Sequence, residues 1–250
     1  MTDGDTRYRG FPGRIGRPEQ LKDRIAVEAA RLMYEEGVKE YFNAKRIAAK
    51  RILGAQGGRR LRFRPRMLPS NGQIQAALLA LADASEGPCR ARRLFAMRVV
   101  ALQHMEPLLS FSPRLIGSVA TGRARWGSDI DIHVFADDTE ALFDCLRDEG
   151  WQWRERKVVI RRGTGLHTYV HIDIESVCPV ELTLYPPADL WATSRSSTDG
   201  KPIDRVSIER LRCRIAAEHP HSWKRYCTQG EVDGLDEFEG DRPGPFDGFL

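Results

Sequence analysis

The segment that most constrains this chain covers residues 128–135 and reads SDIDIHVF, in which acidic and apolar residues alternate. Successive side chains of a strand point to opposite faces, so Asp129 and Asp131 share one face, about 6–7 Å apart. Ile130 and Ile132 share the other face and are expected to be buried. Two carboxylates on one face repel each other unless a cation lies between them. Hard oxygen ligands in this arrangement suit Mg²⁺.

The residues just upstream add a second feature. The short strand expected at 114–116 is followed by Gly117 and Ser118, a turn that leads into a helix. Such a turn offers backbone N–H groups and a hydroxyl, which together can cradle a phosphate. An isolated D-x-D pair on a strand is a weak signal. The ordered set of strand, Gly-Ser, Gly122 and S-D-I-D-I is far more specific and indicates a functional site.

The spacing of the apolar residues changes near residue 111. Before it, a three- to four-residue period predicts helices that begin at Glu19, Val38 and Asn71, and a fourth over 90–109. The imperfect period of the second helix leaves open a break near Asn43. After residue 111, we expect strands at 128–135, 151–160, 167–174 and 180–185, with helices at 139–149 and 207–217. The chain is therefore expected to have an α/β (α+β) fold, in which a helical N-terminal region precedes a smaller α/β unit.

These patterns divide the chain into five regions. They are an irregular arm (1–18), a basic helical region (19–107), an α/β domain (108–190), a helical extension (191–230) and an acidic flexible tail (231–250).

The formal net charge of +4 conceals an uneven distribution. Residues 1–110 sum to +10 and residues 111–250 to −6, and the tail alone supplies −6. The stretch 39–66 holds ten Lys and Arg against one acid, with three aromatic residues interleaved. This stretch is either a contact surface for RNA, DNA or an acidic protein partner, or a solvated helix face with a basic loop.

Composition excludes several classes of protein. No apolar run approaches the roughly 20 residues of a membrane span, and the first ten residues lack the apolar core of a secretory signal. The five cysteines include no C-x-x-C pair, which is typical of reduced thiols. We therefore expect a cytoplasmic protein with no membrane partner. The absence of a G-x-x-x-x-G-K-[ST] loop, a G-x-S-x-G elbow and a kinase signature argues against other nucleotide enzymes and hydrolases.

The stretch 115–135, LIGSVATGRARWGSDIDIHVF, resembles the signature of the nucleotidyltransferase superfamily typified by DNA polymerase beta. Bacterial members often read G-S-x-A-R-G-x-A-R-x-x-S-D-I-D. The chain departs from this pattern at Thr121, where arginine is common. It matches at Gly117, Ser118, Ala120, Gly122, Ala124, Arg125, Ser128, Asp129 and Asp131. The resemblance covers about residues 108–190 and implies a small mixed-sheet nucleotidyltransferase domain. The preceding helical stretch resembles the N-terminal part of bacterial proteins that carry this domain, which implies no particular activity.

The resemblance also implies roles for individual residues. Gly117 and Ser118 are expected to hold the β- and γ-phosphates of an NTP such as ATP. Asp129 and Asp131 are expected to coordinate two Mg²⁺ ions, which assist in-line displacement of pyrophosphate. Arg125 and Ser128 are expected on the nucleotide side of the site, where either Arg123 or Arg125 would neutralise triphosphate charge.

Enzymes of this superfamily use a third carboxylate from a later strand, and the chain offers two candidates. Glu181 lies in PVELTLYP, where an apolar residue precedes it and the strand ends near a proline, as the family pattern has it. Asp173 lies in TYVHIDIES, on the preceding hairpin strand. We favour Glu181 because its position fits the family pattern, although the third acid of the family is more often aspartate. His133 shares the face of the aspartates and either lines the site or is a neutral flanking residue.

The sequence thus predicts a Mg²⁺-dependent nucleotidyltransferase that moves a nucleoside monophosphate from an NTP to an acceptor hydroxyl and releases pyrophosphate. The acceptor is a protein side chain, a small molecule or an RNA end. The alternative is a regulatory protein on the same fold that binds nucleotide or nucleic acid without turnover.

Overall fold

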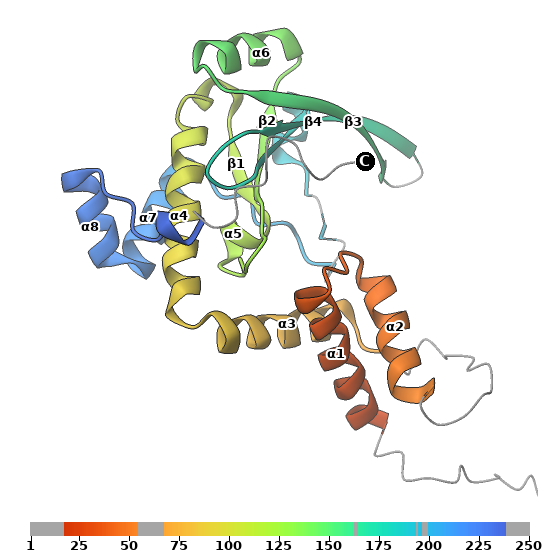
Figure 1. Cartoon of the computed structure of the whole chain (residues 1–250). Coiled ribbons are helices and arrows are strands. Elements are labelled where there is room, and N and C mark those ends of the chain that lie inside the picture. Colours follow the sequence, from red (N-terminus) through yellow and green to blue (C-terminus); the bar gives the residue numbers. More distant parts are fainter. Residues whose placement is uncertain (1–17, 55–67, 163–164, 194, 197–199, 239–250) are drawn as a thin grey trace, which may run out of the picture. The chain divides into compact units, whose positions relative to one another are not determined.

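The structure is a computed structural model of the 250-residue chain. It describes residues 18–54, 68–162, 165–193, 195–196 and 200–238. Over those residues the chain forms eight α-helices and a five-stranded mixed sheet (Figure 1), so the expected α/β class with a helical N-terminal region is confirmed. The chain divides into two compact units, Met1–Leu81 and Ala82–Leu250.

The first unit is built on a pair of packed helices, α1 (Pro18–Glu35) and α2 (Tyr41–Gly54). Apolar residues at three- and four-residue spacing on α1 pack against the alanines of α2, where Ala44, Ala48 and Ala49 are fully buried. Gly37 has a φ of +68°, which ends α1 in the left-handed region that favours glycine. The next helix therefore begins at Tyr41 rather than at the predicted Val38, and it continues through Asn43 without a break.

The helix α3 (Asn71–Glu86) begins where the sequence predicts, and the break expected at Gly87 separates it from α4 (Pro88–Met105). The glycine φ of +53° and a proline at the first turn of α4 account for that break. Of the basic stretch 39–66, residues 55–67 lie outside the described residues, as does nearly all of the predicted N-terminal arm.

The second unit holds the sheet, in the order β1-β2-β5-β4-β3. Its strands are β1 (Arg114–Ile116), β2 (Ile130–Phe135), β3 (Trp153–Arg162), β4 (Gly165–Ile174) and β5 (Val180–Tyr185). The β2–β5 pair is parallel and the other pairs are antiparallel. All five strands were predicted, but β3 is shifted by two residues, β4 begins at Gly165 instead of His167, and β2 begins at Ile130 instead of Ser128.

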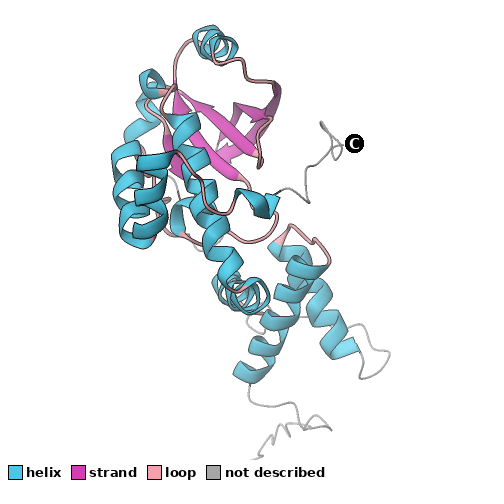
Figure 2. Cartoon of the chain, turned by 60° about the vertical axis from the view of Figure 1, so that its left-hand side comes forward, coloured by secondary structure: helices cyan, strands magenta, loops and turns pink. Residues whose placement is uncertain are grey.

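One face of this sheet is the core of the unit. On β2 the even-numbered Ile130, Ile132 and Val134 are fully buried, as the alternation predicts. The helices α4 and α5 (Gly117–Thr121) contact β2, and helices lie along the sheet in Figure 2. The helix α6 (Thr139–Asp148) begins at Asp138, whose side chain caps the backbone N–H of Glu140.

The chain after β5 returns to the first strand. A 3₁₀ turn, η3 (Pro187–Trp191), is followed by a bridge between Val206 and Leu115, and then by α7 (Ile208–Glu218) and α8 (Pro220–Gln229). The sequence singled out α7, and α8 lies in the same predicted helical extension (191–230). A further turn, η4 (Leu235–Phe238), contacts α4, and residues 239–250 of the predicted tail lie outside the described residues.

None of the helices in the described part of the chain combines the length and the apolar character of a membrane span.

Candidate active site

Three acidic residues lie in one row across the strands β2, β5 and β4. In the parallel pairing of β2 with β5, Asp131 is the direct partner of Glu181. In the antiparallel pairing of β5 with β4, Glu181 is the direct partner of Asp173. Directly paired residues on neighbouring strands have Cβ atoms about 5 Å apart. Glu181 therefore adjoins Asp131, whereas Asp173 is separated from Asp131 by the whole width of β5.

Two residues further along the strands lies a second row, made of His133, Thr183 and His171. His133 and Thr183 are almost fully buried. Burial, followed by the positive charge of Arg205, lowers the pKa of His133 to about 3, so this imidazole is neutral. This favours the interpretation of His133 as a neutral flanking residue.

The Gly117 turn lies directly against Asp131. Gly117 has a φ of +73°, and a Cβ at this position would overlap the Asp131 carboxylate, whose carbon lies 3.3 Å away. Glycine is therefore required both for the backbone conformation and for the close approach. Ser118, the next residue, is half-buried in the first turn of α5. The structure thus brings the predicted Gly-Ser turn and one of the two aspartates together.

Cations from two other helices hold α5 in place. The buried Arg98 of α4 donates from Nε to the carbonyl of Val119 at 3.2 Å, and its guanidinium also pairs with Glu218. Arg214 of α7 donates to the carbonyl of Ala120. These bonds give partners to carbonyl groups near the C-terminal end of a very short helix, where the Val119 carbonyl also accepts the backbone N–H of Gly122.

Asp131 carries the strongest electrostatic signal in the row. Burial, followed by the negative charges of Glu181 and Asp129, raises its pKa to about 7. Asp129 is exposed and lies just before the first residue of β2. The strand therefore fixes the face of Asp131 but not that of Asp129, whereas the sequence predicted that it would hold both. Asp129 is nevertheless close enough for its charge to act on Asp131.

Glu181 is held by two partners. Its Oε1 lies 2.8 Å from Nδ1 of His171, and its Oε2 accepts a hydrogen bond from Arg156. Burial acts to raise the pKa of Glu181, but the bond from His171 and the charge of Arg156 lower it below the ordinary value. Arg156 also pairs with Asp173, at 3.0 Å. The carboxylate nearest to Asp131 is thus ionised and already oriented by its neighbours.

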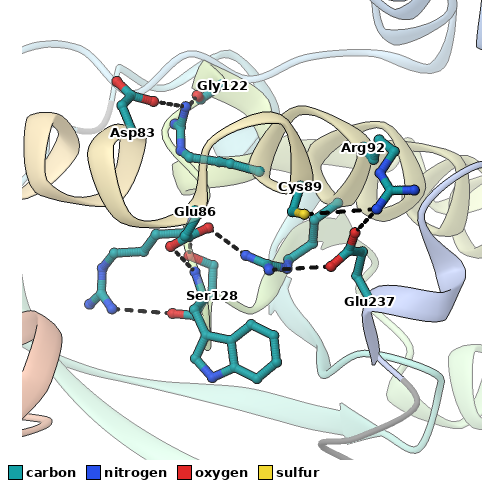
Figure 3. A network of polar contacts seen from close by, with 11 residues as sticks. Asp83, Glu86, Cys89, Arg92, Gly122, Ser128 and Glu237 are labelled. Carbon is teal, nitrogen blue, oxygen red and sulfur yellow. Dashed lines mark hydrogen bonds and ion pairs between the residues drawn. The ribbon is translucent and has the colours of Figure 1, made fainter.

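The predicted residues Arg125 and Ser128 lie in the loop that leads to β2. Ser128 accepts a hydrogen bond from the backbone N–H of Arg125 at 3.0 Å, and its own N–H donates to the Arg125 carbonyl at 3.0 Å. The guanidinium of Arg125 donates to the carbonyl of Trp126 at 3.3 Å. The described contacts of these two residues therefore shape the loop itself (Figure 3).

A buried ion pair anchors this loop and was missed by the sequence analysis. Glu86 of α3 and Arg93 of α4 pair with each other, and each side chain is only 6% exposed. Glu86 also accepts the backbone N–H of Trp126 at 2.9 Å, while the Arg93 guanidinium lies 4.6 Å from the centre of the Trp126 ring. Glu237 of η4 joins the network through Arg93, at 4.0 Å, and it also accepts a hydrogen bond from Arg92 (Figure 3). No local pattern in the sequence links residues so far apart.

The donor set fits a hard divalent cation, although it does not enclose one as it stands. In the part of the chain that the structure describes, no three His, Cys, Asp or Glu side chains are grouped so that they would hold a metal ion. The oxygens of Glu181 contact His171 and Arg156. Asp131 is nonetheless partly buried beside the negative charges of Glu181 and Asp129, and a cation bound by these three carboxylates would compensate their charge.

No family model matches the chain, and neither does any curated protein. Among solved structures, the chain is similar to a cytoplasmic RNA terminal U-transferase, with 21% sequence identity and a TM-score of 0.20. The match covers 43% of this chain and 28% of that one. This similarity is too limited to support a functional conclusion, so such a conclusion depends on the residues of the site.

Proposed function

We propose that this protein is a Mg²⁺-dependent nucleotidyltransferase, which transfers a nucleoside monophosphate from an NTP to an acceptor hydroxyl. The observation that carries this proposal is the direct pairing of Asp131 with Glu181, together with the raised pKa of Asp131. A protein gains nothing in stability from two adjacent carboxylates in a partly buried site. Their presence beside a glycine turn is best explained by a cationic ligand that the site is built to bind.

The roles of the chain's own residues follow from their positions. Asp129, Asp131 and Glu181 would hold Mg²⁺, which when bound supplies positive charge for the phosphates and lowers the pKa of a coordinated oxygen. Gly117 leaves room for the Asp131 carboxylate, and Ser118 presents a hydroxyl one residue away. His171 orients Glu181 through its bond to Oε1.

The proposed reaction exchanges one phosphorus–oxygen bond for another and moves one proton. The acceptor oxygen attacks the α-phosphorus, and the bond from that phosphorus to the bridging oxygen of the β-phosphate breaks. Pyrophosphate leaves with the electron pair of the broken bond, and the acceptor loses its proton. Glu181 is the carboxylate we assign to receive that proton, since it adjoins Asp131 and its lowered pKa keeps it ionised.

Transfer of label is the direct test of this proposal. The full-length protein would be incubated with Mg²⁺ and each of the four α-³²P-labelled NTPs in turn, with total RNA, with a small-molecule extract, or alone to detect modification of protein. We expect label in one acceptor fraction, together with pyrophosphate release, and loss of both in Asp131→Asn. Asp144→Asn is the matched control, because Asp144 is an exposed acid on α6 outside the site. Nucleotide binding without transfer to any fraction would favour the non-catalytic alternative.

A further inference from the structure

One side of the helix α2 carries a row of exposed side chains, made of Phe42, Arg46 and Lys50. The three residues are spaced four apart, so they lie on the same side of the helix, each about 6 Å further along its axis. Phe42 is 71% exposed, which is unusual for a large apolar ring. We call these three residues the α2 face.

The other sides of α2 are already in use. Its three buried alanines pack against α1 (Figure 1). Arg51, on a flank of the helix, pairs with Glu28 at 3.1 Å and with Glu36 at 2.7 Å. Among the described residues, Arg46 and Lys50 have no such acidic partner. The charge of the α2 face is therefore left uncompensated, whereas the charge of Arg51 is compensated.

The charge of α2 has only one sign. Its 14 residues include four Lys and Arg and no Asp or Glu, whereas α1 carries charges of both signs. In the sequence beyond α2, residues 59–66 hold five further arginines and no acid. Clustered cations raise the affinity for a polyanion, because each phosphate that they neutralise releases condensed counterions. The α2 face is thus suited to an anionic polymer.

We propose that the α2 face binds single-stranded RNA, with Arg46 and Lys50 on the phosphates and Phe42 stacked on a base. Acidic peptides are recognised by clusters of cations, which would leave the exposed ring without a role. Single strands are bound by cations together with aromatic side chains on which bases stack. Unpaired, accessible bases are characteristic of the loops and ends of RNA. The α2 face belongs to the first compact unit, and its binding of RNA does not depend on nucleotidyl transfer by the second.

Salt-dependent binding of a labelled RNA tests this proposal. A fluorescein-labelled oligo(U) of about 20 nucleotides would be titrated with the full-length wild type, Phe42→Ala, Arg46→Ala and Lys50→Ala, without NTP, and followed by fluorescence anisotropy at several NaCl concentrations. We expect Arg46→Ala and Lys50→Ala each to bind about 3- to 10-fold more weakly and to lower the slope of log Kd against log salt by about 0.7, the contribution of one phosphate contact. Phe42→Ala should bind about 5- to 50-fold more weakly with an unchanged slope, because a stacked ring carries no charge.

Arg24→Ala is the matched control, because it removes an exposed arginine from α1 instead of α2. It should leave both the affinity and the slope unchanged, and an equal loss in this variant would reduce the effect to net charge and overturn the proposal. Equal melting temperatures of the variants would show that these exposed changes leave the fold intact.

Three other results would also overturn the proposal. They are wild-type affinity for oligo(U) in Phe42→Ala, Arg46→Ala and Lys50→Ala, tighter binding of the same sequence as DNA, and binding of polyglutamate as tight as that of RNA, which would point to an acidic protein. Failure of the wild type to bind RNA would overturn this proposal alone, because transfer of label to a protein or a small molecule would still support the proposed function.

Discussion

Asp131 and Glu181 lie fifty positions apart in the sequence, yet they are direct neighbours in the parallel pairing of β2 with β5. Each was singled out as a candidate for its own reasons, Asp131 in the S-D-I-D-I motif and Glu181 on a later strand. Their adjacency is a property of the sheet order, because β5 rather than β3 or β4 pairs with β2. The site is therefore created by the crossover that brings β5 beside β2.

Removal of the Asp131 charge should stabilise the protein at alkaline pH. Burial and the neighbouring acids raise the folded-state pKa to about 7, above the ordinary value of 3.8, so the folded state holds a proton that the unfolded state has lost. Stability is thus lost as the pH rises from about 4 to about 7. At pH 8 without metal, Asp131→Asn should raise the free energy of unfolding by about 1–3 kcal/mol in urea titrations. The difference in the free energy of unfolding between Asp131→Asn and the wild type should shrink at pH 4. A variant less stable than the wild type at pH 8 would contradict the account.

Gly117→Ala should damage both the fold and the site. The added Cβ would overlap the Asp131 carboxylate and would also strain a backbone with a φ of +73°. We expect a loss of about 2–4 kcal/mol in the free energy of unfolding, measured with urea. Gly127→Ala is the matched control, because Gly127 has a φ of +70° but no atom within 4 Å of the added Cβ. Equal losses in both variants would mean that the contact with Asp131 contributes nothing.

Glu86→Ala should be strongly destabilising although Glu86 lies outside the carboxylate row. It leaves the guanidinium of Arg93, whose side chain is 6% exposed, without its buried partner, and it removes the acceptor of the Trp126 N–H. Loss of one member of a buried pair typically costs about 3–5 kcal/mol. Asp83→Ala, which breaks the more exposed pair with Arg90, should cost less than about 1 kcal/mol in the same urea titration. Similar losses for the two variants would contradict the anchoring role of Glu86.

His133 should make the protein sensitive to acid. Burial lowers its pKa to about 3, below the ordinary 6.5, so the unfolded state takes up a proton before the folded state does. Its contribution to stability is present above pH 6.5 and is lost as the pH falls toward 3. His133→Phe keeps a ring next to Tyr185, which lies 4.5 Å away between ring centres, and should flatten the stability profile between pH 6 and pH 4. An unchanged acid transition in that variant would show that His133 does not titrate as described.

The local patterns of the sequence predicted most elements of the fold. The alternation around Ile130 and Ile132 placed β2 and its buried face correctly, and the glycine at 87 marked the boundary between α3 and α4. Boundaries were less accurate, as for α2, which begins at Tyr41 instead of Val38. The helix α8 lies in the predicted helical extension but was not singled out, although proline is favoured at the first turn of a helix.

The sequence offered candidate residues for the site but did not predict the contacts among them. Pairing across a sheet depends on strand order, which no local pattern encodes, so the contact between Arg156 and Glu181 was not anticipated. The same holds for the pair Glu86–Arg93, which joins two helices and a distant loop. Asp129 was expected on a strand, but it lies one residue before β2, where the backbone no longer fixes its face.

The central claim is that the carboxylates around Asp131 bind a nucleotide through Mg²⁺, and calorimetric titration of the four NTPs tests it most directly. Each NTP would be titrated into the full-length wild type, Asp131→Asn and the control Asp144→Asn, first with Mg²⁺ and then with EDTA. We predict that at least one NTP binds the wild type and the control only when Mg²⁺ is present, and that Asp131→Asn weakens this binding at least about tenfold. Absence of magnesium-dependent binding in the wild type, or equal binding by Asp131→Asn, would contradict the account.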